Sequence, residues 1–156
     1  MAIGSADRVN EKRSVKTINV SQAEGLALGW LVAKADTNLY PVGDIRLLDG
    51  KLLSINAGDY EYSDRWRQYS PPTDWSQGGP IIEREGINLS VDYQDSALSN
   101  DMVQIGWKGN LWNNSVPGTA GFLQWAYGPT PLIAAMRCFV ASKLGETVEV
   151  PEELCK

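Results

Sequence analysis

The sequence predicts an α+β fold in which two main helices pack on a small, mainly antiparallel sheet. Two observations lead to this prediction: an apolar stripe with helical spacing near each end of the chain, and short β-prone runs separated by turn residues between them. The 156 residues, 43% of them hydrophobic and 21% charged, suffice for one globular core. We therefore expect a single domain over residues 15–156, preceded by a mobile N-terminal segment over residues 1–14.

The first helix is predicted to begin at Ser21 and to fade near Asp36. Ser21 and Glu24 have the spacing of a capping box, in which each side chain bonds to the backbone N–H of the other residue. Gly25 and Gly29 lower the helix propensity, and their small size would let another element approach closely. The buried stripe is predicted to consist of Ala23, Leu26, Ala27, Trp30 and Leu31.

The second helix is marked at both ends. Thr130 is a natural N-cap, Pro131 suits the first helical position, and Gly145 suits the stop after the last turn. Lys143 complements the negative end of the helix dipole. We expect this helix to be the central core helix, with a stripe formed by Leu132, Ala135, Met136, Phe139 and Val140.

Between the helices, short apolar runs predict strands, and Asp49–Gly50 predicts a hairpin turn between the first two. The stretch Asn110–Gly128 is rich in Asn, Gly and Pro and predicts a long loop. The predicted strands are Ile45–Leu48, Leu52–Ile55, Ile81–Ile82 with its flanks, Ile87–Tyr93, Met102–Trp107 and an edge strand Val148–Val150.

Composition excludes several classes of function. The net charge of −5 disfavours general nucleic-acid binding, which needs a surplus of Lys and Arg. The absence of histidine removes His-activated nucleophiles and His-bound zinc. Cys138 and Cys155 read as a buried small side chain and a tail thiol without a disulfide. With no apolar h-region or membrane-length apolar run, we expect a cytoplasmic protein that binds something without catalysis, cofactor or metal.

Tyr69–Glu85 is the densest segment for chemistry. Gly78 and Gly79 can place successive N–H groups in a nest for an anion such as phosphate. Trp75 could stack on a base or sugar, and Arg84 could meet the charge. The alternative is a rigid structural turn, with Trp75 as a core anchor and Asp74 as a cap.

Two further clusters contain aromatic residues. Residues 64–69 (Asp-Arg-Trp-Arg-Gln-Tyr) alternate charge and aromatic character, which suits either an exposed edge strand or a binding rim. Trp107, Trp112, Trp125 and Tyr127 include more tryptophan than one small core holds easily, so some of them are expected at a concave site or an interface. The candidate ligand-binding residues are Arg65, Arg67, Tyr69, Asp74, Trp75, Gln77, Gly78, Gly79, Arg84 and Trp107.

Three further charged residues, Glu83, Glu85 and Arg137, each have two possible roles. Glu83 and Glu85 lie two apart on a predicted strand, so they would share a face and could hold Mg²⁺ or do acid–base work. Simple surface alternation with Arg84 is the alternative. Arg137 lies off the apolar stripe of its helix and either hydrogen-bonds the region of Asp74 or faces water.

Three segments resemble a known family. Tyr69–Ile87 (YSPPTDWSQGGPIIEREGI) and Gly128–Leu154 (GPTPLIAAMRCFVASKLGETVEVPEEL) are similar to the NinX-like family of phage proteins. Gly25–Asp36 (GLALGWLVAKAD) resembles the opening helix of that family. The resemblance implies a small accessory product of a tailed phage and supplies no catalytic residues. The first fourteen residues and Asp95–Phe122 look like additions to the family pattern.

Three functions are compatible with these residues. The leading hypothesis is a non-enzymatic anti-defence sponge, which sequesters a nucleotide-derived immune signal in the bacterial host. A homo-oligomer with sites between subunits would suit the spare aromatic residues. The alternative is an inhibitor or adaptor that docks on a host protein through an acidic, aromatic surface. The third is a metal-dependent phosphodiesterase built on Asp74, Glu83 and Glu85.

Overall fold

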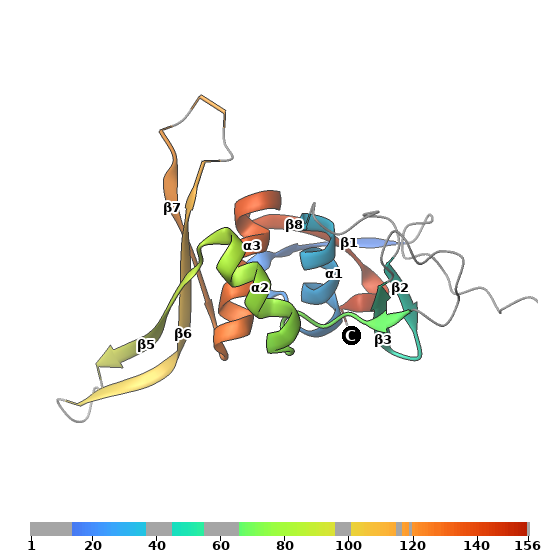
Figure 1. The fold of residues 1–156 in the computed structure, drawn as a ribbon, viewed down its shortest axis with the longest axis horizontal. Helices are drawn as coiled ribbons and strands as arrows, with labels where there is room; N and C mark the ends of the chain where they lie inside the picture. The colour runs from blue at the N-terminus through green and yellow to red at the C-terminus, as the bar shows by residue number, and fades with distance from the viewer. Residues whose placement is uncertain are drawn as a thin grey trace, which may run out of the picture.

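A computed structural model describes residues 14–36, 45–54, 66–95, 101–114, 117–118 and 120–155. Within these residues, three α-helices and three antiparallel sheets form the predicted α+β fold (Figure 1). The helices are α1 (Gly25–Ala35), α2 (Trp75–Glu85) and α3 (Pro131–Leu144), with 3-10 turns at Val20–Gln22 and Glu152–Leu154. The sheets are β1 (Val15–Asn19) with β8 (Thr147–Pro151); β2 (Ile45–Leu48), β3 (Lys51–Ser54) and β4 (Arg67–Gln68); and β5 (Asn88–Asp95), β6 (Met102–Asn113) and β7 (Phe122–Gly128).

Helix α3 is the central core helix, as predicted. The Thr130 side chain accepts a hydrogen bond from the N–H of Ile133 at 3.2 Å, and Gly145 ends the helix at φ +89°. The helix contacts α1, α2 and all three strands of the β5–β6–β7 sheet. Its stripe is buried throughout, at Leu132, Ala135, Met136, Phe139 and Val140. None of the helices in the described part of the chain is long and apolar enough to cross a membrane.

Helix α1 ends as predicted but begins later. Asn19 accepts a hydrogen bond from the N–H of Ser21 at 2.9 Å, which places Ser21 inside a 3-10 turn rather than at an α-helical N-cap. The chain then runs extended through Glu24, whose side chain makes no capping hydrogen bond, so the predicted capping box is wrong. Asp36 is the C-cap. A Cβ on Gly29 would lie 3.2 Å from a Leu52 methyl, so the expected close approach of another element occurs here, against β3.

The segment predicted as an irregular glycine turn and a strand at Ile81–Ile82 is helix α2, which is the largest correction to the prediction. Asp74 caps it, accepting from the N–H of Ser76 at 2.9 Å, and Gly86 ends it at φ +66°. Pro80 removes one backbone hydrogen bond, but it lies on the exposed side of the helix, where water can satisfy the freed carbonyl. The two caps and the burial of Ile81 outweigh the poor propensity of Gly-Gly-Pro.

The prediction of a loop over Asn110–Gly128 is wrong at both ends of this range. Strand β6 continues to Asn113, and β7 occupies Phe122–Gly128. Gly109 and Gly128 serve packing rather than a turn. A Cβ on Gly109 would lie 3.1 Å from the carbonyl oxygen of Ala134. A Cβ on Gly128 would lie 2.7 Å from the backbone nitrogen of Ala134. These glycines let the backbone of α3 lie directly on the sheet.

The other predicted strands are present, whereas β1 was not predicted. Asp49 and Gly50, both at positive φ (49° and 71°), form the tight turn of the β2–β3 hairpin. The run Val148–Val150 lies in β8, which pairs antiparallel with β1. The predicted mobile segment lies outside the described residues, apart from Ser14.

The neighbouring glycines of α2 give opposite predictions. A Cβ on Gly78 would meet the carbonyl oxygen of Pro71 at 2.5 Å and a Leu132 methyl at 2.6 Å, so we expect Gly78→Ala to lower the free energy of unfolding by about 2 kcal/mol. Gly79 has no atom within 4 Å of such a Cβ, so we expect Gly79→Ala to raise it by about 0.5–1 kcal/mol. Urea denaturation of the two variants measures both values, and equal effects would contradict this packing.

Candidate functional site

A cleft of about 390 Å³ opens between helix α2 and strands β3 and β4. Most of its lining residues are polar or charged, and they come from segments far apart in the sequence. The lining residues are Asp36, Ser54, Arg67, Gln68, Tyr69, Ser76, Gln77, Pro80, Ile81 and Arg84.

Gln77 fixes one wall of the cleft. Its side-chain oxygen accepts from the N–H of Ser70 at 2.8 Å, and its amide nitrogen donates to the carbonyl of Gln68 at 3.0 Å and to Asp74 at 3.1 Å. The segment between β4 and α2 is thereby tied to the first turn of α2. Because both amide hydrogens are in use, Gln77 holds the cleft in shape and has little capacity to bind a ligand.

Tyr69 lines the cleft and carries an unusual buried group. The residue is 8% exposed and its N–H pairs with the Leu52 carbonyl at 2.8 Å. The buried hydroxyl has no hydrogen-bond partner among the described residues. Burial, reinforced by the negative charge of Asp36, raises the pKa of Tyr69 above its ordinary value, so the hydroxyl stays protonated and can donate.

Arg84 is held by a chain of charges that joins the three helices. Its Nη2 lies 3.0 Å from Asp36, at the end of α1, and its Nε lies 3.0 Å from Glu85. Glu85 also pairs with Lys143 of α3 at 3.1 Å. Partial burial alone would lower the pKa of Arg84, but the hydrogen bond with Glu85 and the charge of Asp36 outweigh it and raise the pKa. The guanidinium is therefore fixed in place and permanently charged.

Arg67 is the second cation of the cleft. It is exposed on β4, opposite Ser54 of β3. Its guanidinium forms no ion pair within the part of the chain that the structure describes. The cleft therefore has two cations and one carboxylate, that of Asp36, so its lining carries a net positive charge on an acidic protein.

Comparison with known proteins identifies the family. The sequence model described as "Bacteriophage P22, NinX" matches residues 19–143, which is well over half of the chain. The chain belongs to the phage P22 NinX family. No curated protein matches it.

In this NinX-family chain the cleft gathers four of the candidate ligand-binding residues: Arg67, Tyr69, Gln77 and Arg84. Sequence reasoning missed the contribution of Asp36, which it treated only as the end of a helix, and that of Ser54. The signal for Asp36 was weak: an acidic residue at a helix C-terminus is unfavourable for the helix dipole and therefore needs a cationic partner, here Arg84.

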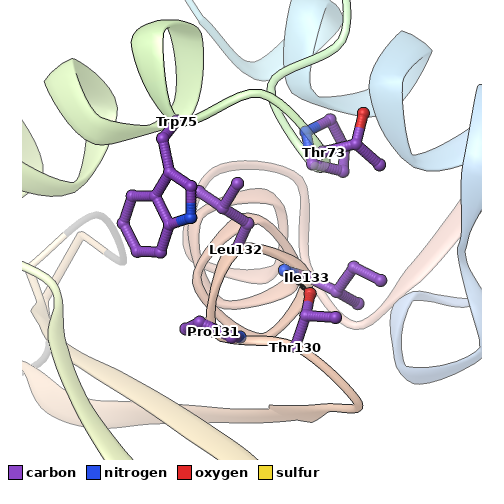
Figure 2. Close-up of a pocket in the computed structure, with 7 residues that line it drawn as sticks. Thr73, Trp75, Thr130, Pro131, Leu132 and Ile133 are labelled. Atoms are coloured by element: carbon purple, nitrogen blue, oxygen red, sulfur yellow. Dashed lines mark hydrogen bonds between the residues drawn. The ribbon is translucent and has the colours of Figure 1, made fainter.

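Trp75 lies elsewhere. It borders a separate hollow of about 240 Å³ at the start of α3, where Figure 2 shows its indole beside Leu132 and Pro131. The side chain is 55% exposed, so it is not a core anchor, and it does not line the cleft as a stacking partner. Asp74 is the cap of α2, which matches the alternative interpretation of that residue.

The predicted anion nest does not form. The N–H of Gly78 donates to the Asp74 carbonyl at 2.8 Å as part of a helical turn, and Gly79 follows inside α2. Trp107 lies on β6, away from the residues that line the cleft. Arg65 falls outside the described residues.

The other charged positions also differ from prediction. Residues two apart on a helix point about 200° apart, so Glu83 and Glu85 do not share a face. Within the described residues no group of three or more Cys, Asp or Glu side chains could hold a metal ion. Arg137 neither reaches Asp74 nor faces water: it is buried, and it donates to the carbonyls of Ala23 and Tyr127, both at 2.9 Å.

The two cysteines are as predicted. Cys138 is buried in α3 and Cys155 is exposed, and neither forms a disulfide. Burial raises the pKa of Cys138 to about 12, which keeps its thiol protonated and unreactive.

We expect Tyr69→Phe to raise the free energy of unfolding of the unliganded protein by about 1 kcal/mol, because a buried hydroxyl without a partner costs stability. Urea denaturation measures the change. Tyr93→Phe is the control: its hydroxyl belongs to a side chain that is 52% exposed, and its removal should change stability by less than about 0.5 kcal/mol. A loss of stability in Tyr69→Phe would mean that the hydroxyl is already satisfied.

We expect Glu85 to make the free energy of unfolding depend on pH in the acidic range. Burial alone would raise the pKa of Glu85, but its hydrogen bonds with Arg84 and Lys143 outweigh it and lower the pKa below the ordinary value of 4.5. The stabilisation is therefore complete above that value and is lost as pH falls through the lower pKa of the folded state. We expect Glu85→Gln to cost about 1 kcal/mol at pH 7 and less at pH 3, as urea denaturation at both pH values would show.

Glu83→Gln is the matched control for this pH dependence. Glu83 is exposed on the same helix and forms no ion pair with the residues described here. Its substitution should leave the difference in stability between pH 7 and pH 3 unchanged. If both variants reduced the difference in stability between pH 7 and pH 3 by a similar amount, the pH dependence would come from net charge rather than from the Glu85 ion pairs.

Proposed function

We propose that this phage accessory protein is a non-enzymatic binder that sequesters a small, phosphate-bearing ligand of nucleotide type in the cleft between α2 and the β3–β4 strands. The observation that carries the proposal is the convergence of the guanidinium groups of Arg67 and Arg84 on one cleft. Tyr69 also lines this cleft and carries a buried hydroxyl that has no partner among the described residues.

The donor set suits a phosphate group. Guanidinium groups bind phosphate oxygens through paired, charge-assisted hydrogen bonds, and they keep their charge at every physiological pH. Arg84 is held in position by Asp36 and Glu85 before any ligand arrives, so little side-chain entropy is lost on binding. A phosphate oxygen that accepts a hydrogen bond from Tyr69 would satisfy the buried hydroxyl. This hydrogen bond would stabilise the bound state and is absent from the free protein.

The size and the walls of the cleft suit the rest of such a ligand. A volume of about 390 Å³ lies at the lower end of the range for small-molecule sites, about 300–1,000 Å³. Ile81, Pro80 and the ring of Tyr69 supply an apolar wall against which a base or ribose can pack. Ser54 and Gln68 supply further polar groups.

The side chains of the cleft favour binding over turnover. Its carboxylate, Asp36, is ion-paired with Arg84 rather than placed as a base. The raised pKa of Tyr69 prevents its hydroxyl from acting as a base or nucleophile near neutral pH. A ligand would therefore leave the cleft unchanged, as sequestration of an immune signal requires.

The test is a thermal-shift screen with cyclic dinucleotides, ADP-ribose and inorganic pyrophosphate, each with and without Mg²⁺. A ligand at one hundred times its dissociation constant stabilises the folded state by about 2.7 kcal/mol, which is a shift of several degrees for a domain of this size. We expect a shift for one ligand class, and recovery of that ligand intact after denaturation. A changed ligand would contradict the non-enzymatic proposal.

Variants locate the binding site. We expect Arg67→Ala and Tyr69→Phe each to weaken the affinity for the ligand at least tenfold by calorimetry, while the fold persists. Trp75→Ala is the matched control, because Trp75 lies in the other hollow and should leave the affinity unchanged. Loss of binding in Trp75→Ala alone would move the site to that hollow. If no ligand shifts the transition, the proposal fails, and docking on a host protein becomes the function to test by pull-down.

A further inference from the structure

The β5–β6–β7 sheet is much longer than the helix that covers it. Strand β6 has 12 residues and therefore extends about 40 Å, whereas the 14 residues of α3 span about 21 Å. Figure 1 shows the consequence: the β6–β7 end and the β5–β6 end both reach past the helices. The helices lie on one face of this sheet, and Figure 1 shows no described element on the other.

The uncovered face carries large aromatic side chains. Along β6 and β7, residues that face α3, such as Leu111 and Gln124, are buried. Their neighbours in the sequence point the other way: Trp112 is 59% exposed, Trp125 is 42% exposed and Tyr127 is 54% exposed. The strand register places these side chains side by side, with Trp112 opposite Leu123, Asn110 opposite Trp125, and Lys108 opposite Tyr127.

The β5–β6 end adds apolar residues beyond the body of the protein. The register shifts at Asp92/Tyr93, and past this bulge the two strands continue as a two-stranded ribbon. A two-stranded ribbon is at best marginally stable alone in water. The large apolar side chains of this ribbon are each at least half exposed, at Tyr93, Met102, Val103 and Ile105.

We propose that this outer face of the β5–β6–β7 sheet, with its projecting ribbon, is the contact between two copies of this chain. The inference does not depend on the ligand proposed above. It predicts a symmetric dimer in which the two sheets pack face to face, at the spacing of about 10 Å that stacked sheets adopt.

The charges on the face favour a second copy over other occupants. Lys108 and Asp92 lie on the same face, two residues apart in register, and neither forms an ion pair with another described residue. A two-fold axis can place Lys108 of one copy against Asp92 of the other, so the surface is complementary to itself. A nucleic acid would need several cations, and the net charge of −5 would repel it.

The area is of the right order for a dimer. The three strands have 8, 12 and 7 residues. At about 3.4 Å per residue and about 4.8 Å between strands, they present roughly 450 Å² on one face, without the added area of the side chains that project from it. Stable interfaces bury about 800 Å² per partner. The exposed side chains of Trp112, Trp125 and Tyr127 project from the face and add to the area that a partner can cover.

The test is the mass of the full chain by sedimentation equilibrium at concentrations from about 1 to 200 μM. We expect the mass to approach twice the chain mass of 17.1 kDa at the upper end. Ile105→Asp, on the ribbon, and Tyr127→Asp, on the sheet face, should each raise the dissociation constant at least tenfold. Circular dichroism should show that both variants are folded, because both side chains are exposed in the single chain.

Trp75→Asp is the matched control, because Trp75 is exposed to the same degree but lies beside the start of α3. It should leave the dimer unchanged. A mass of one chain across the whole range would overturn the proposal. So would a dimer that survives both Ile105→Asp and Tyr127→Asp, because the contact would then lie on another face.

Discussion

The close approach of α3 to the β5–β6–β7 sheet is the constraint on which the rest of the structure depends. At Gly128 the helix backbone comes so near that no Cβ fits between the two layers, and at Gly109 a Cβ would make a tight contact with it. The helix also packs against α1 and α2. Arg137 completes the arrangement by joining the carbonyls of Ala23 and Tyr127 from inside α3, which fixes the start of α1 relative to the end of β7.

The cleft follows from the same arrangement. Because α1 and α2 both pack on α3, the end of α1 and the last turn of α2 come together, and Asp36 reaches Arg84 there. Glu85 and Lys143 extend the contact back to α3. Arg84 thus has a defined position only because three helices share one core. The cleft is a product of helix packing, and residues that never touch a ligand set its shape.

The sequence predicts the parts of this fold that local signals determine. Thr130, Pro131 and Gly145 mark α3 because capping is a local interaction, and Asp49–Gly50 marks a hairpin because the turn needs two residues at positive φ. Helix α2 and strand β7 escape prediction for one shared reason: their glycines resemble turn signals. In the structure Gly78 lies against Pro71 and Leu132, and Gly128 lies against Ala134, so these two glycines serve close packing rather than a turn.

The candidate site also contains some residues that the sequence predicts and others that it does not. Arg67, Tyr69 and Arg84 were predicted because their chemistry suits an anion, and the structure does bring them into one cleft. Trp75 was grouped with them because it is near in sequence, but on a helix its position at the first turn sends it toward α3 instead. Asp36 could not be assigned, because its partner lies 48 residues away along the chain.

The cleft and the outer face of the sheet belong to different sides of the molecule. The cleft lies between α2 and the β3–β4 strands, whereas the outer face is turned away from all three helices (Figure 1). A dimer through the outer face would therefore leave both clefts open to solvent, and each copy would bind its own ligand. Because no residue of the cleft lies on the β5–β6–β7 sheet, ligand binding would neither require the dimer nor be blocked by it. Self-association in this arrangement would serve stability, by covering the ribbon and the exposed aromatic side chains, rather than completing the site.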